Sequence, residues 1–205
     1  AYYPEYIPEW THCNPQPPRP DYLLAAAVLP RTHAPHLDLS KLILDGKGKY
    51  PLEHFNPGGT HWSMLAVAIS AQEIAAKISA QGRWQLPEVR FSSAIDNHPE
   101  GIDSDLLDVL NLWTPHKDYP VARVTFAQAE PVRPRAPRLA IVGGSFMGQM
   151  YLALRDTNMF ERADYYSYLI MEHVSHPWLP PPAPSPYDAA YYRELLDADI
   201  VIVEE

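Results

Sequence analysis

The chain has 205 residues and a formal net charge of −9, with few Lys and Arg and no basic run. This balance argues against nucleic acid and anionic membrane surfaces as partners, and no stretch approaches the roughly 18 consecutive apolar residues of a membrane span. Cys13 is the single cysteine, which excludes an internal disulfide and a cysteine-based metal site. A hydrophobic share of 46% over this length suits one sizeable core, and we expect a single domain over residues 1–205.

Proline is over-represented, with 23 residues that cluster at residues 15–20, 131–137 and 177–186. Long apolar segments separate these clusters, which therefore indicate loops over a rigid scaffold and not a disordered chain. The first residues have the character of an internal segment, and the apolar run at residues 200–203 lies almost at the terminus. We therefore expect a piece of a longer protein, for which the lack of a targeting segment carries no information about compartment.

In chain order, the first half of the sequence predicts mainly helices. Residues 1–20 are expected to be extended, residues 21–29 to form a short helix, and residues 37–44 to form a strand or a helix. Residues 63–81 give the clearest helix, with apolar residues at helical spacing, Ser63 as its N-cap and Gly82 just beyond its end.

The second half alternates strands with helices. Strands are predicted at residues 121–127, 139–142, 165–171 and 200–203, and helices at residues 146–155 and 187–196. Continuous apolar strands that alternate with helices are typical of a parallel sheet covered on both faces, which defines an α/β fold. In such sheets functional sites gather at the carboxyl ends of the strands.

The most informative motif is Gly143-Gly144-Ser145, which follows the strand predicted at residues 139–142. Two glycines allow the tight turn that lifts a side chain out of a strand end, and the free N–H groups of a helix start can stabilise an anion. Ser145 therefore has the setting of an acyl-transfer nucleophile, with backbone N–H groups of Ser145 and Gly144 as the oxyanion site. The same turn also serves purely structural roles, and Met147 replaces the final glycine of G-x-S-x-G.

A nucleophilic serine needs a base, and His61 is the best placed of the nine histidines. It stands in Gly59-Thr60-His61-Trp62-Ser63, directly before the clearest helix. The positive end of that helix disfavours the imidazolium and so keeps the ring able to accept a proton. Trp62 could form a wall for a sugar. A loop histidine that merely caps the helix is the alternative interpretation.

These motifs together resemble the SGNH-hydrolase-like polysaccharide O-acetyltransferases of the alginate O-acetylation type. In that family an Asp-x-His-Trp segment precedes a Gly-x-Ser segment, and here Gly-Thr-His-Trp-Ser precedes Val-Gly-Gly-Ser-Phe. The opening Tyr-Pro-Glu-Tyr-Ile-Pro and the leucine-rich run at residues 105–112 also resemble family segments. The resemblance implies an SGNH-like three-layer sandwich with a mostly parallel sheet, Ser145 as nucleophile and His61 as base.

The resemblance further implies an enzyme that moves acetyl groups onto hydroxyls of an exported polysaccharide in the periplasm. The acetyl donor would be delivered by a membrane partner, and neither a cofactor nor a metal would take part. A carbohydrate esterase or deacetylase would use the same residues with water as acceptor. A non-catalytic polysaccharide-binding subunit of the export machinery is the alternative from another class, because Gly59 stands where the family has its acid.

A carboxylate distant in sequence is expected to replace the acid missing at Gly59, because a lone neutral histidine has no fixed tautomer. Asp38 is the first candidate, since it borders an apolar segment that could be a neighbouring strand. The remaining candidates are Asp103, on a loop that could fold over the site, and Glu53, Asp96 and Glu204.

Two further patterns carry weaker signals. The tyrosine-rich runs at residues 165–168 and 191–192 could line a carbohydrate cleft, with Tyr168 as a substrate contact, although half-buried aromatic residues explain them equally well. The pairs His33/His36 and His173/His176 have spacings found in metal sites, but prolines border or interrupt them and neither pair lies on a predicted helix. We therefore expect no metal ion.

Overall fold

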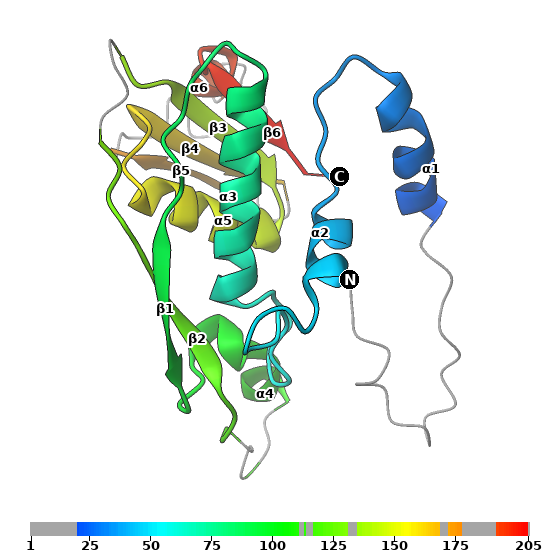
Figure 1. Cartoon of the computed structure of the whole chain (residues 1–205), viewed down its shortest axis with the longest axis vertical. Helices are drawn as coiled ribbons and strands as arrows, with labels where there is room; N and C mark the ends of the chain where they lie inside the picture. Colours follow the sequence, from blue (N-terminus) through cyan, green and yellow to red (C-terminus); the bar gives the residue numbers. More distant parts are fainter. Residues whose placement is uncertain are drawn as a thin grey trace.

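The computed structural model describes residues 20–110, 113, 117–130, 135–168, 172–177 and 192–204 (Figure 1). The segment expected to be extended at residues 1–20 lies outside the described residues apart from Pro20, as does the first half of the helix expected at residues 187–196. None of the helices within the described ranges is long and apolar enough to span a membrane.

The order of elements follows the predicted sequence of helices and strands closely. The helices expected at residues 21–29, 63–81 and 146–155 and the strands expected at 139–142 and 200–203 are confirmed to within one or two residues. The segment expected at residues 37–44 forms a helix over residues 39–46, and the strand expected at 165–171 lies at 162–167. The elements are α1 (Pro20–Val28), the 3-10 helix η3 (Leu29–Arg31), α2 (Leu39–Gly46), α3 (Met64–Ala80), β1 (Phe91–Asp96), the 3-10 helix η4 (Gly101–Asp103), α4 (Asp105–Val109), β2 (Val121–Phe126), β3 (Arg138–Gly143), α5 (Ser145–Asp156), β4 (Arg162–Ser167), β5 (Glu172–His176), α6 (Arg193–Leu196) and β6 (Ile200–Val203).

The central sheet has the strand order β5-β4-β3-β6. β3 pairs in parallel with both β4 and β6, whereas β4 pairs antiparallel with β5. The register places Val142 beside Tyr166 on one side and Val203 on the other, so β3, β4 and β6 end at the same edge of the sheet. The prediction of a mostly parallel sheet is confirmed.

Helices cover both faces of this sheet (Figure 1). On one face Leu139 and Ile141 of β3 join the main core, together with side chains of α3 and with Leu154 of α5. On the other face Ala140 of β3 packs in a smaller cluster with Leu195 of α6. Alternate residues of one strand thus enter two separate cores, which gives the three layers that were predicted.

The strand predicted at residues 121–127 belongs to a different sheet. β2 pairs antiparallel with β1 in a two-stranded ribbon, and Figure 1 shows this ribbon beside α3 and beyond the end of the central sheet. Ala122 packs there with Leu65 and Ile69 of α3. β1 was not predicted, because its sequence Phe-Ser-Ser-Ala-Ile-Asp is mostly exposed and lacks an apolar run.

α3 is enclosed by protein along its first half. Every residue from Leu65 to Ala71 is buried, which is the pattern of a helix with neighbours on all sides. The Ser63 hydroxyl accepts a hydrogen bond from the N–H of Ala66 at 3.3 Å, and Gly82 beyond the helix has a φ of +80°. The predicted cap and stop are both confirmed, and the helix start that follows His61 is firmly fixed.

His54, in the loop before α3, is a buried histidine with 2% of its surface exposed. Its Nδ1–H donates to the carbonyl of Ile43 at 3.1 Å. Burial lowers the pKa of His54 below its ordinary value, since the hydrogen bond to Ile43 and the charge of Glu53 oppose that effect only in part. The unfolded chain therefore takes up this proton at a higher pH than the folded chain.

We predict that the free energy of unfolding decreases as the pH falls through about 6.5, the ordinary pKa of histidine. The decrease continues down to the lower pKa of the folded state, with a slope of at most about 1.4 kcal/mol per pH unit. Urea unfolding at a series of pH values measures the slope. The substitution His54→Gln should flatten it and His33→Gln, at an exposed position, should not. An unchanged slope in His54→Gln would contradict the assignment.

Candidate active site

Ser145 stands at the start of α5, directly after the carboxyl end of β3. Its side chain is exposed, and Gly144 before it is the N-cap of the helix. A Cβ on Gly143 would lie 2.6 Å from the Cβ of Met147 and 2.9 Å from Oε2 of Glu204, so the turn leaves no room for a side chain. Ser145 is thus presented at the sheet edge where the sequence motif predicts a functional residue.

His61 lies beside the residue that follows Ser145. The rings of His61 and Phe146 have their centroids 5.2 Å apart, and the loop that carries His61 is closed by an isolated bridge between Phe55 and Trp62. The starts of α3 and α5 therefore bring the two sequence motifs together. His61 and Ser145 form no hydrogen bond among the contacts of the described residues, so that bond stays a prediction.

The carboxylate beside His61 belongs to Asp105. Nδ1 of His61 lies 2.5 Å from Oδ2 of Asp105. Thr60 donates to the same carboxylate twice, from its N–H to Oδ1 at 2.6 Å and from its hydroxyl to Oδ2 at 2.8 Å. The side chains of His61 and Asp105 are 17% and 28% exposed. A carboxylate distant in sequence therefore lies against His61, where we expect one to replace the acid missing at Gly59.

The hydrogen bonds around Asp105 fix its charge and the tautomer of its neighbour. Burial alone would raise the pKa of Asp105, but the hydrogen bonds from the N–H and hydroxyl of Thr60 and from His61 outweigh burial and hold the pKa below its usual range. Asp105 is therefore ionised at neutral pH and can only accept. The proton of a neutral His61 then sits on Nδ1, which leaves Nε2 as the basic nitrogen.

The prediction that Asp38 partners His61 is wrong. Asp38 is the N-cap of α2, and it accepts from the N–H of Lys41 and from the hydroxyl of Tyr22, both at 2.9 Å. An aspartate before an apolar run is the sequence of a capped helix as much as of a strand end. Of the other candidates, Glu53 is exposed, Asp96 and Asp103 pair with Arg123, and Glu204 accepts from Gly144.

Close packing at Gly59 explains why the acid is elsewhere. A Cβ at this position would lie 2.5 Å from the carbonyl oxygen of Ile102 and 3.3 Å from that of Asp103. The segment that leads to Asp105 thus fills the space that a side chain at residue 59 would need. The same segment excludes a side chain from position 59 and supplies a carboxylate to His61.

Sequence reasoning missed Asp105 because it carries no distinguishing signal. Asp105 is the first residue of α4, where an acidic residue is ordinary since it suits the positive end of the helix. It also lies 44 positions from His61, so no spacing rule links the two residues.

The oxyanion site differs from the prediction at Gly144. The N–H of Gly144 donates to Oε2 of Glu204 at 2.6 Å, and the hydroxyl of Tyr168 donates to the same oxygen at 3.2 Å. The Gly144 N–H is therefore already engaged and is not an open donor. The N–H of Ser145, at the first position of α5, has no partner within the helix. It stays as the predicted oxyanion donor.

The two aromatic residues proposed as substrate contacts have different settings. Trp62 is only 5% exposed and belongs to the main core, so the expectation that it forms a wall for a sugar is corrected. Its ring lies 5.7 Å from that of Phe146, and it supports the residue against which His61 packs. Tyr168 is 48% exposed at the carboxyl end of β4, and its role as a substrate contact stays a prediction.

The histidine pairs do not form a metal centre in the part of the chain that the structure describes. Nε2 of His173 in β5 lies 2.9 Å from Oδ1 of Asp164 in β4. Three or more metal-ligating side chains do not gather anywhere in the described ranges.

Comparison with known proteins identifies the fold. No protein-family model and no curated protein matches this sequence. By structure, the chain has the SGNH-like α/β fold of O-acetyltransferase domains.

Two solved structures carry this assignment. The O-acetyltransferase domain of Pseudomonas putida AlgJ has 19% sequence identity and a TM-score of 0.51, over 89% of this chain and 62% of that one. Pseudomonas aeruginosa AlgX has 17% identity and a TM-score of 0.50, over 90% of this chain and 42% of that one. The chain thus spans less than two thirds of either structure, and identities this low establish a shared fold alone.

We predict that Gly59→Asp destabilises the protein by about 1–3 kcal/mol, because its Cβ would collide with the backbone of residues 102 and 103. Gly59→Ala should show most of this loss. Gly148→Ala in α5 is the matched control, since a Cβ there has its nearest neighbour at 3.4 Å. Thermal unfolding measures all three. A Gly59→Asp variant of normal stability would show that the segment at residues 102–105 does not block this position.

Proposed function

We propose that this chain is an O-acetyltransferase that moves acetyl groups onto hydroxyls of an exported bacterial polysaccharide. The observation that carries the proposal is the pair of His61 and Asp105, which lies beside the start of α5 where Ser145 is exposed. A serine at a helix start, a histidine with a basic Nε2 and a partly buried carboxylate on Nδ1 are the three parts of a serine acyl-transfer site. The shared fold with O-acetyltransferase domains supports this reading.

In the proposed reaction His61 Nε2 takes the proton of the Ser145 hydroxyl as Oγ attacks the acetyl carbonyl of the donor. The tetrahedral intermediate collapses, His61 returns the proton to the leaving group, and Ser145 carries the acetyl ester. A sugar hydroxyl then gives its proton to His61 and attacks the ester. The second tetrahedral intermediate breaks its bond to Oγ, His61 passes the proton to Oγ, and the acetylated sugar leaves Ser145 free. The Ser145 N–H would hold the oxyanion in both steps, and ionised Asp105 would stabilise the imidazolium formed in each.

The surroundings of the reaction are part of the same proposal. The acceptor would be a polysaccharide in the periplasm, and a membrane partner would deliver the acetyl donor. The described chain would act as one SGNH-like domain of a longer protein. Tyr168, exposed beside Glu204 near Ser145, is the side chain that we assign to the acceptor sugar.

A carbohydrate esterase is the second candidate, and the exposure of Ser145 favours it. Water that reaches the acetyl ester on Oγ would act as the acceptor instead of a sugar hydroxyl and would release acetate. The basis for a non-catalytic subunit was the lost acid at Gly59, and the carboxylate of Asp105 weakens that argument.

We predict that Ser145→Ala abolishes turnover of a generic acetyl ester, and that Asp105→Asn lowers kcat by roughly 10³- to 10⁴-fold because it removes the charge that fixes the His61 tautomer. Asp38→Asn, a carboxylate in another part of the fold, is the matched control and should keep wild-type kcat. The rate of ester hydrolysis, monitored by the release of a chromophoric leaving group, measures the effect of all three substitutions. Equal activity of Asp105→Asn and Asp38→Asn would remove Asp105 from the site.

We also predict that the acetylated enzyme passes its acetyl group to an oligosaccharide in preference to water. With an acetyl ester donor and a neutral or uronate oligosaccharide, mass spectrometry of the products should show acetylated sugar that increases with acceptor concentration while free acetate decreases. Tyr168→Phe should shift this partition towards acetate without a change in the rate of Ser145 acetylation. Acetate alone at every acceptor concentration would identify the chain as an esterase.

A further inference from the structure

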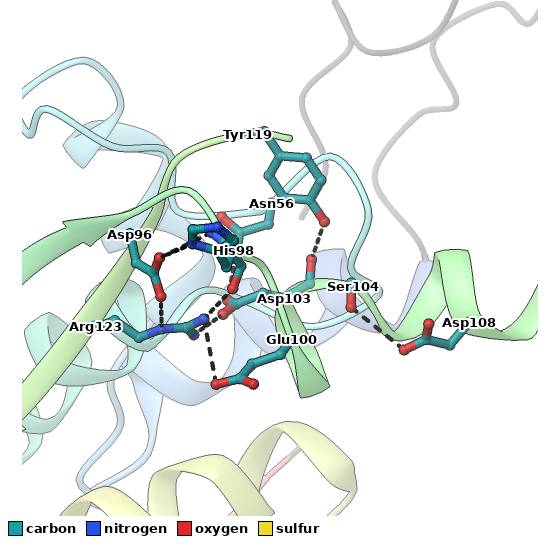
Figure 2. Close-up of polar contacts among 9 residues, drawn as sticks. All are labelled: Asn56, Asp96, His98, Glu100, Asp103, Ser104, Asp108, Tyr119 and Arg123. Atoms are coloured by element: carbon teal, nitrogen blue, oxygen red, sulfur yellow. Dashed lines mark hydrogen bonds and ion pairs between the residues drawn. The ribbon is translucent and has the colours of Figure 1, made fainter. Parts of the chain in front are cut away.

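Asp103 is a buried carboxylate two residues before Asp105. It is 2% exposed, and both of its oxygens are bonded: Oδ1 accepts from Nδ2 of Asn56 at 2.6 Å, and Oδ2 accepts from Nη1 of Arg123 at 2.7 Å. Figure 2 shows these three side chains pointing toward one another from three separate segments. We call Asn56, Asp103 and Arg123 the Asp103 network.

Neighbouring contacts hold this network from outside. Arg123 also donates from Nε to Oδ2 of Asp96 at 2.9 Å, which ties it across the β1–β2 ribbon. The hydrogen bonds from His98 and Arg123 lower the pKa of Asp96 to about 2. The hydroxyl of Tyr119 donates to the carbonyl of Asp103 at 2.6 Å, so both the side chain and the backbone of Asp103 are fixed (Figure 2).

The network lies at the junction of the two loops that carry His61 and Asp105. Asn56 belongs to the loop of His61, and its carbonyl accepts from the N–H of Gly59 at 3.1 Å. The N–H of Leu107 donates to the carbonyl of Gly58 at 3.2 Å. The bond between Asn56 and Asp103 is therefore one link in a series between residues 56–61 and 103–107 that ends at the carboxylate of Asp105.

No apolar side chain of the segment at residues 101–109 is buried. α4, which begins with Asp105, has no buried residue, and Asp103 is the one buried residue of η4. Burial raises the pKa of Asp103 because it disfavours the charge, and the ion pair with Arg123 offsets that effect only in part. A buried ion pair of this kind adds little net stability and is suited instead to selecting one geometry.

We propose that Asn56, Asp103 and Arg123 are positioning residues that hold Asp105 against His61. Without them the segment at residues 101–109 keeps its hydrogen bonds to Gly58, Thr60 and Tyr119 but loses its buried side-chain anchor. The carboxylate of Asp105 would then leave Nδ1 of His61 for water. The proposal rests on the proposed function for its kinetic readout, whereas the contact between His61 and Asp105 can be followed without any turnover.

The first test is spectroscopic. In ¹H NMR the proton on Nδ1 of His61, held by Asp105, should give a downfield resonance that Asp105→Asn removes. We expect Asn56→Ala and Asp103→Asn to broaden this resonance or abolish it. Asp199→Asn is the matched control, because Asp199 is a partly buried carboxylate that pairs with Arg135 at 2.6 Å at the opposite end of β3, and it should leave the resonance unchanged.

The second test is kinetic. Asn56→Ala and Asp103→Asn should lower kcat for a generic acetyl ester by roughly ten- to hundredfold through misplacement of the catalytic groups, with KM nearly unchanged. The exchange Asn56→Asp with Asp103→Asn restores a donor and an acceptor across the same gap and should recover both kcat and the resonance in part. A role in stability alone would lower the melting temperature and leave both readouts intact, which would overturn the proposal.

The two proposals fail in different ways. If the wild-type protein shows the resonance and loses it in Asn56→Ala but hydrolyses no ester, the positioning role stands and the proposed function fails. If ester hydrolysis depends on Ser145 and Asp105 while Asn56→Ala keeps full kcat and the resonance, the proposed function stands and the positioning role fails. Should Asp103→Asn not fold, Asn56→Ala decides the matter, since it removes one donor and leaves the ion pair with Arg123.

Discussion

The carboxylate of Asp105 is the contact on which the candidate site depends. It accepts hydrogen bonds from the backbone and hydroxyl of Thr60 and from the ring of His61, and so joins a loop before α3 to a helix start more than forty positions later. Because Thr60 and His61 are consecutive, the carboxylate fixes the backbone that carries the histidine as well as its ring. A single acidic residue thereby sets both the place and the tautomer of the proposed base.

The two sides of the site are held by different kinds of interaction. Ser145 follows a strand in the middle of a close-packed sheet, and α5 behind it contributes Met150 and Leu154 to the main core. Asp105 follows a 3-10 helix whose one buried residue is charged. Apolar packing therefore fixes the serine, whereas directional hydrogen bonds fix its partners, and such bonds tolerate little error in geometry. Because of this difference, we expect the site to be more sensitive to substitutions around His61 and Asp105 than to substitutions around Ser145.

Much of the fold and half of the site could be predicted from the sequence. The strand before Ser145 and the helix after His61 have apolar patterns and caps that act over a few residues, and these local signals are reliable. Asp38 was misread because an acidic N-cap and an acidic strand end look alike. Asp105 was missed because its partner is remote in sequence. Trp62 was interpreted as a sugar contact because its packing against Phe146 of α5 leaves no signal in its own segment. The roles of these three residues depend on contacts between segments that are distant in sequence. A pattern within one segment carries no information about such contacts.

The N–H of Gly144 already donates a hydrogen bond to Glu204, so the Gly-Gly-Ser motif is not simply an open site for an anion. Glu204 reaches this N–H from the end of β6, the strand beside β3, and its approach is one of the contacts that forbid a side chain at Gly143. The first glycine of the motif is therefore needed for the close approach of a carboxylate and of Met147, and not for the capture of an oxyanion. With a negative charge already placed at the start of α5, further stabilisation of an oxyanion falls to the N–H of Ser145. The motif predicts the position of the serine correctly, but the strand next to it in space sets the electrostatics of its surroundings.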